Sequence, residues 1–193
     1  MSPVALPFIT VVSGVPRSGT SMMMSVLEAG GLEPMKDDIR AADEDNPRGY
    51  YELELVKKLK VDAAWVDRAV GKVVKVVHAH LRDLPRDRHR YRVVLMRRDM
   101  TEVLRSQRKM LERRGVPGGK ISDERAAAIY SKQLAELEDW MRAEPAFDHI
   151  AADYNELVRD PGPGLRAIHA FLGGTLDLKA MHGPIDPTLY RSA

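Results

Sequence analysis

The sequence predicts an α/β fold with three layers, in which a mainly parallel sheet carries helices on both faces. Short apolar runs rich in β-branched residues predict buried strands, and the segments between them have the apolar periodicity of helices. Strands that alternate with helices of this length indicate βαβ units, because neighbouring parallel strands need a long crossover between them. The predicted strands cover residues 7–13, 72–80, 91–97 and 148–153.

Start and stop signals accompany the predicted helices. Gly30 and Gly31 stop the first helix, Ser122 is a candidate N-cap for the fourth, and Gly173 stops the last. The acidic segment 32–52 is rich in turn-forming pairs and is predicted to be a loop. The predicted helices cover residues 20–29, 55–70, 99–114, 122–142 and 165–172.

Length and composition favour one domain over residues 1–193. The 193 residues are 44% apolar, which is enough for a sizeable core. Cysteine is absent, which excludes disulfides, thiolate metal sites and cysteine nucleophiles. The sequence shows neither a basic leader nor an apolar run near the ~20 residues of a membrane span. We therefore expect a cytoplasmic protein that does not associate with membranes.

Charge is distributed unevenly along the chain, although the formal net charge is only +2. Residues 33–54 carry eight acids against three bases, whereas residues 82–114 carry twelve bases against five acids. A basic run of this kind attracts polyanions, although a solvated helix face explains it equally well. Aromatic residues make up 6% of the chain and do not interleave with the basic run, so the sequence does not favour nucleic acid as a partner.

The segment GVPRSGTS, residues 14–21, has the context of a phosphate-binding loop. It follows a predicted strand and opens a predicted helix, so successive backbone N–H groups and the helix N-terminus can hold an anion. The loop has the G-x-x-x-x-G frame, but Thr20 stands where a Walker A loop has lysine, and the basic residue is Arg17. An ordinary ATPase is therefore less favoured than an enzyme whose donor, such as a phosphosulfate, needs no magnesium bridge.

GVPRSGTS resembles the loop by which sulfotransferases hold the 5′-phosphosulfate of 3′-phosphoadenosine 5′-phosphosulfate, and it is closest to the GVPRSGTT form of the tyrosylprotein enzymes. The resemblance implies the fold of that family and places Arg17 near the bridging oxygen of the donor. The loop residues expected to bind the donor are Gly14, Pro16, Arg17, Ser18, Gly19, Thr20 and Ser21.

A second motif of the family binds the donor's 3′-phosphate with an arginine at a strand end and a serine eight residues later. Arg98 and Ser106 have this separation, at the transition from the third predicted strand to its helix. A helix of that length brings the hydroxyl and the guanidinium toward one anion, with the helix dipole adding to the attraction. Met100 departs from the family pattern, which often has proline there.

A third match lies near the carboxyl terminus. Tyr154-Asn-Glu-Leu157, Arg159-Asp-Pro161 and Phe171-Leu-Gly173 are similar to the family's Y-E-D-L, DP and FLG segments. In the family this tyrosine lies near the adenine, and a core tyrosine is the equally plausible alternative for Tyr154. The tail DPTLYR at 186–191 resembles a bacterial branch of small sulfotransferase-like proteins, and its Arg191 is a further candidate to reach the nucleotide.

Sulfuryl transfer to a hydroxyl needs a general base, and three residues are candidates. His78 and His80 follow the second predicted strand, where the cytosolic enzymes of the family have a catalytic histidine, and the sequence does not choose between them. Glu52 is the rival, because the tyrosylprotein branch uses a glutamate after the loop helix. Lys75 lies inside an apolar strand, where it either pairs with a carboxylate or reaches the site.

The leading hypothesis is in-line transfer of a sulfuryl group from 3′-phosphoadenosine 5′-phosphosulfate to a hydroxyl acceptor, with no metal. A kinase using ATP and magnesium is the alternative enzyme, in which an acidic-loop carboxylate holds the metal. The carboxylates considered for that role are Asp37, Asp38, Asp43 and Asp45. A non-catalytic nucleotide sensor is the third hypothesis. The sequence leaves the acceptor and the oligomeric state open.

Overall fold

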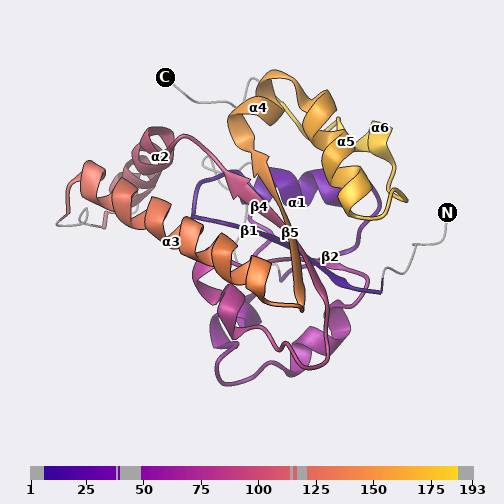
Figure 1. The fold of residues 1–193 in the computed structure, drawn as a ribbon. Helices are drawn as coiled ribbons and strands as arrows, with labels where there is room; N and C mark the ends of the chain where they lie inside the picture. Colours follow the sequence, from indigo (N-terminus) through magenta and orange to yellow (C-terminus); the bar gives the residue numbers. More distant parts are fainter. Residues whose placement is uncertain (1–6, 38, 40–48, 114, 117–120, 187–193) are drawn as a thin grey trace.

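One parallel sheet of five strands organises the chain in the computed structural model (Figure 1). The strand order is β2-β3-β1-β4-β5, and neighbouring strands pair in parallel. The strands are β1 (Ile9–Gly14), β2 (Pro34–Met35), β3 (Val73–Lys75), β4 (Tyr91–Arg97) and β5 (Phe147–Asp153). The structure describes residues 7–37, 39, 49–113, 115–116 and 121–186. The predicted α/β fold is confirmed.

The central strand β1 determines where a ligand can bind. All six of its residues are buried, as expected for a strand with parallel neighbours and both faces covered. From β1 the chain adds β2 and β3 on one side of the sheet and then returns to add β4 and β5 on the other. Strand order reverses between β1 and β4, and ligands of such sheets bind outside the carboxyl ends of the strands at this point. The loop after Gly14 begins there.

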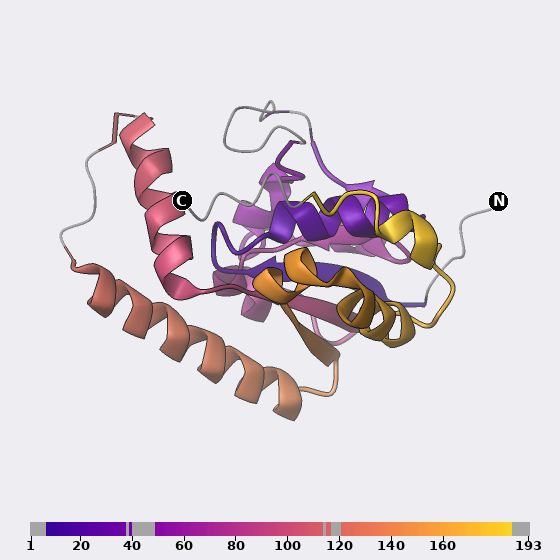
Figure 2. The same cartoon turned by 90° about the horizontal axis from the view of Figure 1, so that it is seen from above.

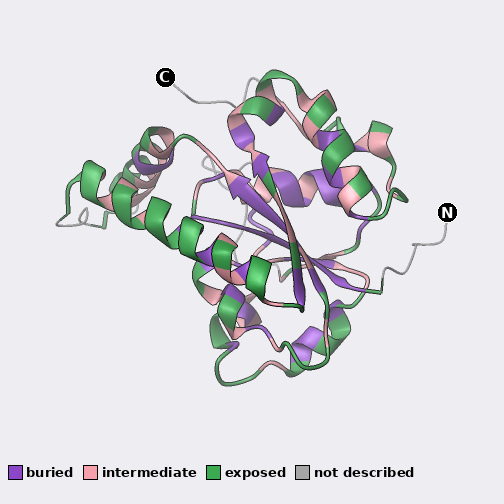
Figure 3. Cartoon of the chain, viewed as in Figure 1, coloured by how far each residue is buried: buried purple, intermediate pink, exposed green. Residues whose placement is uncertain are grey.

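Helices cover both faces of the sheet (Figures 1 and 2). One face carries α1 (Thr20–Ala29), α4 (Tyr154–Arg159), α5 (Pro161–Phe171) and α6 (Leu178–Met181). The other face carries three 3₁₀ helices and α3 (Asp123–Ala143). Helix α2 (Met100–Arg113) and α3 form a hairpin whose far end extends beyond the sheet (Figure 2). Burial follows these layers, with the central strands β1 and β4 mostly buried and the outer faces of the helices exposed (Figure 3).

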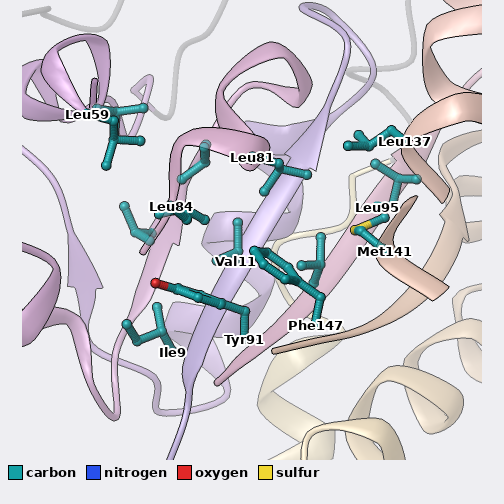
Figure 4. Close-up of a cluster of buried hydrophobic side chains, with 14 of the residues drawn as sticks. Ile9, Val11, Leu59, Leu81, Leu84, Tyr91, Leu95, Leu137, Met141 and Phe147 are labelled. Atoms are coloured by element: carbon teal, nitrogen blue, oxygen red, sulfur yellow. The ribbon is translucent and has the colours of Figure 1, made fainter. Parts of the chain in front are cut away.

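The core under α3 is built around stacked aromatic rings (Figure 4). The rings of Tyr91 and Phe147 lie 4.7 Å apart between centroids, with an interplanar angle of 20°. The Tyr91 hydroxyl donates a hydrogen bond to the Pro85 carbonyl over 2.6 Å, so the buried polar atom is satisfied. Burial raises the pKa of Tyr91 above its ordinary value of 10.0, which keeps this ring neutral.

The prediction of one helix over residues 55–70 is wrong. The structure has two 3₁₀ helices instead, η1 (Glu54–Lys58) and η2 (Ala64–Ala69). The Asp62 side chain accepts a hydrogen bond from the Ala64 backbone N–H at 2.9 Å, and this local bond begins a new turn in place of the continuing helix. The apolar pattern did mark buried residues, since Val66 and Ala69 are buried. These residues lie on a short 3₁₀ helix instead of one long α-helix.

The second predicted strand, 72–80, is too long. β3 ends at Lys75, and the two histidines belong to a third 3₁₀ helix, η3 (His78–Asp83). The His80 N–H donates to the Val77 carbonyl at 2.8 Å, which bends the chain away from the sheet. Segment 32–52 also contains the edge strand β2, where a loop was predicted. Its first residue is Pro34, which an edge strand tolerates because no neighbour needs its missing N–H.

The remaining predicted elements lie close to the observed ones. The predicted helices at 20–29, 99–114 and 122–142 correspond to α1, α2 and α3. Ser122 is the N-cap of α3, where its side chain accepts from the Arg125 N–H at 3.4 Å. Helices α4 and α6 were not predicted. None of the helices in the described ranges combines the length and apolar character needed to cross a membrane.

Candidate functional site

The loop between β1 and α1 contains a tight turn with an unusual residue in it. The Ser18 N–H donates to the Val15 carbonyl at 3.1 Å, so Pro16 and Arg17 are the central residues of the turn. Arg17 has a φ of 77°, in the left-handed region. Proline second and a positive φ third are the features of a type II turn, in which the third residue is usually glycine. An arginine here retains backbone strain, which points to a role for its side chain.

Two glycines let other parts of the chain approach this loop closely. A Cβ on Gly19, whose φ is 96°, would lie 2.3 Å from Cδ2 of Tyr154. A Cβ on Gly14 would lie 2.4 Å from Oγ of Ser18 and 2.9 Å from the Met96 carbonyl oxygen. The loop therefore packs directly on the end of β4 and on the first residue of α4.

The residues of the first two motifs meet at this loop. Arg17 Nε donates to Ser106 Oγ over 2.8 Å, although the two residues are 89 positions apart. Arg98 Nη1 donates to the Arg17 carbonyl over 3.2 Å. The ends of β1 and β4 thus bring both predicted arginines and the predicted serine to one place.

Arg98 is held on several sides. Its Nε donates to Glu102 Oε2 over 2.9 Å, and its guanidinium carbon lies 4.3 Å from the centroid of the Tyr154 ring. Both members of the ion pair are mostly buried, with 10% of the Arg98 side chain and 17% of the Glu102 side chain exposed. Asn155 in turn donates to Glu102 Oε1 over 3.1 Å and accepts from the Asp99 N–H over 3.2 Å. The orientation of Arg98 is therefore fixed by α2 and α4 together.

His78 contacts the start of the same loop from the face of the sheet that carries α3, opposite the face that carries α1. Its Nδ1 is 3.3 Å from the Gly14 carbonyl oxygen, and its Nε2 is 3.1 Å from Oε1 of Gln133 on α3. The ring meets that of Tyr130 edge to face at 6.0 Å. His80 instead pairs with Asp83 at 3.3 Å within η3 and is partly exposed. Of the two histidines, the structure places His78 beside the loop.

Two more of the predicted site residues, Ser21 and Lys75, contact the backbone carbonyl of Tyr50. Ser21 Oγ, in the first turn of α1, is 3.3 Å from this oxygen, and Lys75 Nζ donates to it as well. Lys75 was expected to pair with a carboxylate or to reach the site. In the structure its ammonium group donates to a backbone carbonyl, that of Tyr50. Glu52 lies two residues further, where its backbone carbonyl accepts from the Asp37 N–H at 2.9 Å.

Ser18 and Thr20 complete the loop. Ser18 is fully buried, and its Oγ has no hydrogen-bond partner among the described residues. Thr20 is the first residue of α1, so its backbone N–H belongs to the helix N-terminus, where orphan donors favour an anion. The structure therefore has the helix N-terminus after the loop that the predicted anion site requires.

The acidic segment supplies no metal site in the part of the chain that is described, where no group of three or more His, Asp and Glu side chains could hold a metal ion. Asp37 has a local role, since its carboxylate accepts from the Glu54 N–H at 2.6 Å. Asp38, Asp43, Asp45 and Arg191 lie outside the described residues.

Several polar residues of the site were not predicted. Gln107 on α2 donates to the Pro16 carbonyl over 2.9 Å, and Gln133 contacts His78. Glu102 and Asn155 brace Arg98. The four-residue spacing between Arg98 and Glu102 is the usual helical ion-pair spacing and could have revealed that pair. No sequence signal marks Gln133, because the contact depends on how the α2–α3 hairpin folds back.

These features define a parallel α/β protein with a strand, loop and helix at the switch point of its sheet. Its sequence matches no protein-family model and no curated protein. Among solved structures, it is similar to the sulfotransferase domain from the Synechococcus PCC 7002 olefin synthase, with a TM-score of 0.57 and 16% identity over 98% of this chain and 88% of that one.

Two further structures agree. The sulfotransferase domain from the curacin biosynthetic pathway has a TM-score of 0.51 and 18% identity, over 95% of this chain and 79% of that one. The sulfotransferase from Alicyclobacillus acidocaldarius has a TM-score of 0.52 and 17% identity, over 96% of this chain and 89% of that one. The protein therefore has the fold of sulfotransferase domains, as the loop motif predicted.

Proposed function

We propose that the protein is a one-domain sulfotransferase that moves a sulfuryl group from 3′-phosphoadenosine 5′-phosphosulfate to a hydroxyl acceptor. The observation that carries this proposal is the contact of Arg17 with Ser106, reinforced by Arg98 on the Arg17 carbonyl. Two basic motifs distant in sequence converge at the switch point of a sheet with the sulfotransferase fold. One nucleotide carrying two anionic groups is the ligand that such a convergence fits.

The loop would hold the 5′ end of the donor. Gly14 and Pro16 shape the turn, while the backbone of Gly19, Thr20 and Ser21 would supply N–H groups at the N-terminus of α1. Arg98 and Ser106 would bind the 3′-phosphate. Tyr154, whose ring lies against both Gly19 and the Arg98 guanidinium, would face the adenine side of the nucleotide.

In the proposed transfer, residues of the chain supply the general base and the groups that stabilise charge. The acceptor oxygen attacks sulfur while the bond from sulfur to the bridging oxygen breaks, and adenosine 3′,5′-bisphosphate leaves. Arg17 would stabilise the charge that develops on the bridging oxygen and the leaving phosphate. His78 would take the acceptor proton, because it is the candidate base whose ring contacts the loop. Lys75 would hold Tyr50 beside Ser21.

Calorimetry separates this proposal from the kinase hypothesis. Adenosine 3′,5′-bisphosphate should bind in the presence of EDTA, and radiolabelled sulfuryl donor should transfer its label to a simple phenol such as 4-nitrophenol. Binding of ATP that depends on magnesium, with no binding of the bisphosphate, would replace the proposal by the kinase. Binding of the bisphosphate with no transfer to any hydroxyl probe would favour the nucleotide sensor.

A further inference from the structure

Gln133 covers the outer nitrogen of His78. Gln133 is an exposed residue in the middle of α3, yet its carboxamide oxygen lies 3.1 Å from Nε2 of a histidine that is only 9% exposed. The inner nitrogen of the same ring, Nδ1, faces the Gly14 carbonyl at 3.3 Å. The two nitrogens of His78 thus have different neighbours, one inside the protein and one at its surface.

The Gly14 carbonyl decides which nitrogen of His78 can act as a base. A carbonyl oxygen only accepts, so Nδ1 must carry the proton, and the lone pair of the neutral ring is then on Nε2. A carboxamide presents N–H or C=O according to how it is turned. Turned one way, Gln133 donates to the Nε2 lone pair. Turned the other way, it accepts from Nε2–H once the ring is protonated.

We propose that Gln133 occupies the place of the acceptor hydroxyl and is a specificity-determining residue of the transfer reaction. This inference rests on the proposed function, in which His78 takes the acceptor proton. In the structure the Gln133 oxygen faces Nε2. An acceptor O–H would make the hydrogen bond to Nε2 that the Gln133 N–H makes when the carboxamide is turned the other way, so it reaches the base by displacing the carboxamide. The acceptor would therefore bind between η3 and α3, beside the Tyr130 ring.

The proton balance of the step is complete within this group of residues. The acceptor proton moves to Nε2 as its oxygen bonds to sulfur, while Nδ1–H stays on the Gly14 carbonyl. The resulting imidazolium is a donor at both nitrogens. The oxygen of the displaced Gln133 side chain can turn toward Nε2–H when the sulfated product leaves, so one exposed side chain matches both protonation states of the ring.

The geometry distinguishes this role from simple packing. The ring of His78 is already held by the Gly14 carbonyl at Nδ1 and by its edge-to-face contact with Tyr130. Gln133 adds a single contact from a surface position, where alanine is a good helix former. Its removal should therefore expose Nε2 without disturbing the fold.

Diethyl pyrocarbonate, which acylates accessible neutral imidazole nitrogens, tests the proposal. In the Gln133→Ala variant, peptide mass spectrometry should show His78 modified about fivefold faster than in the parent protein, since one hydrogen bond no longer protects it. Lys132→Ala is the matched control, because Lys132 is the neighbouring exposed residue of α3 and pairs with Glu136. An unchanged His78 rate in Gln133→Ala would overturn the proposal.

A transfer assay adds the second readout. With 4-nitrophenol as the acceptor, Gln133→Ala should lower the KM for the phenol several-fold and leave the affinity for adenosine 3′,5′-bisphosphate unchanged. A faster His78 modification with an unchanged KM would overturn the acceptor position. A faster modification with no transfer by either protein would overturn the sulfotransferase assignment, and Gln133 would remain only the residue that covers His78.

Discussion

Arg17 combines a backbone conformation that favours glycine with a side chain that contacts Ser106. Its φ of 77° costs an ordinary L-residue about 1 kcal/mol or more. Natural turns of this kind usually avoid that cost by using glycine at the position. The arginine is therefore retained against local conformational preference, which is the pattern expected at a functional site.

Comparing Arg17→Gly with Arg17→Ala separates the backbone from the side chain. Both variants lose the contact with Ser106, but only alanine retains the left-handed strain. We expect the glycine variant to exceed the alanine variant in unfolding free energy by about 1 kcal/mol, measured by urea denaturation. Both should transfer sulfuryl groups far more slowly than the parent protein. An alanine variant as stable as the glycine variant would show that Arg17 is not strained.

His78 and His80 lie two residues apart and provide a matched pair for the base assignment. His78→Ala should lower the transfer rate by about 10²- to 10⁴-fold, the usual contribution of a general base. His80→Ala should retain most activity, because His80 pairs with Asp83 instead of facing the loop. Steady-state rates at saturating donor give the comparison. A larger loss in His80→Ala, or in Glu52→Gln, would move the base to that residue.

Helix α2 is the element that joins the two halves of the site. Its first turn carries Glu102, one turn later it carries Ser106, and these residues share a face because four positions complete about one turn. Val103 and Leu104 are buried on its other side, which fixes the rotation of the helix. Gln107 adds a hydrogen bond to the Pro16 carbonyl. A displacement of α2 would therefore disturb both ends of the proposed donor site.

The Glu102 carboxylate pairs with the Arg98 guanidinium and would compete with any anion that binds to Arg98. Glu102→Gln keeps an oxygen acceptor for Arg98 Nε but removes the carboxylate charge that would repel a 3′-phosphate. We expect the variant to bind adenosine 3′,5′-bisphosphate about fivefold more tightly, given the Coulomb energy of charges near a protein surface, and AMP as before. Calorimetry gives both affinities.

Glu138→Gln is the control for this measurement. Glu138 pairs with Arg97 at 2.7 Å, and 16% of its side chain is exposed, close to the value for Glu102. Its loss should change neither affinity. If Glu102→Gln weakened the binding of both nucleotides equally, Glu102 would act by holding α2 in place and would not compete for Arg98.

The sequence revealed these elements unequally. The first strand, its loop and α1 follow one another without a gap, so local patterns and one motif were sufficient to place them. The region from Glu54 to Asp83 was misjudged, because Asp62 and the turn at Val77 break the apolar pattern through hydrogen bonds that periodicity does not show. The contact of His78 with Gly14 depends on that turn, so the sequence could not choose between the two histidines.

At the scale of the whole molecule, the order of the strands explains why distant motifs meet. Arg17 and Arg98 follow neighbouring strands of one parallel sheet, so their proximity could be expected once the sheet was predicted. The bracing of Arg98 by Asn155 and the cover of His78 by Gln133 could not, since both depend on how helices pack beside the sheet. The sequence thus indicated where the candidate site lies, and the packing of α2, α3 and α4 determines its geometry.

A histidine on the edge strand β5, His149, contributes to the dependence of the unfolding free energy on pH. Burial lowers the pKa of His149 on β5 below its ordinary value of 6.5; the carboxylates of Glu138 and Asp148 oppose this effect, and the guanidinium groups of Arg142 and Arg97 add to it. Between the folded and unfolded pKa values the unfolded chain binds more protons, so acid favours unfolding. The contribution is complete above about pH 6.5 and is lost as pH falls through the folded pKa.

Replacing His149 should therefore flatten the acid side of the stability profile. His149→Gln is expected to have an unfolding free energy that falls less steeply than that of the parent protein as pH decreases below about 6.5. Urea denaturation at a series of pH values measures this slope. Parallel profiles for the two proteins would assign the acid sensitivity to other groups.

The two ends of the donor site are tested most directly by the ratio of two affinities. Calorimetry in EDTA should show that the parent protein prefers adenosine 3′,5′-bisphosphate to AMP, and that Arg98→Ala reduces this preference at least about tenfold, as loss of a charge-assisted hydrogen bond predicts. An unchanged preference in Arg98→Ala, or no binding of either nucleotide to the parent protein, would contradict the account.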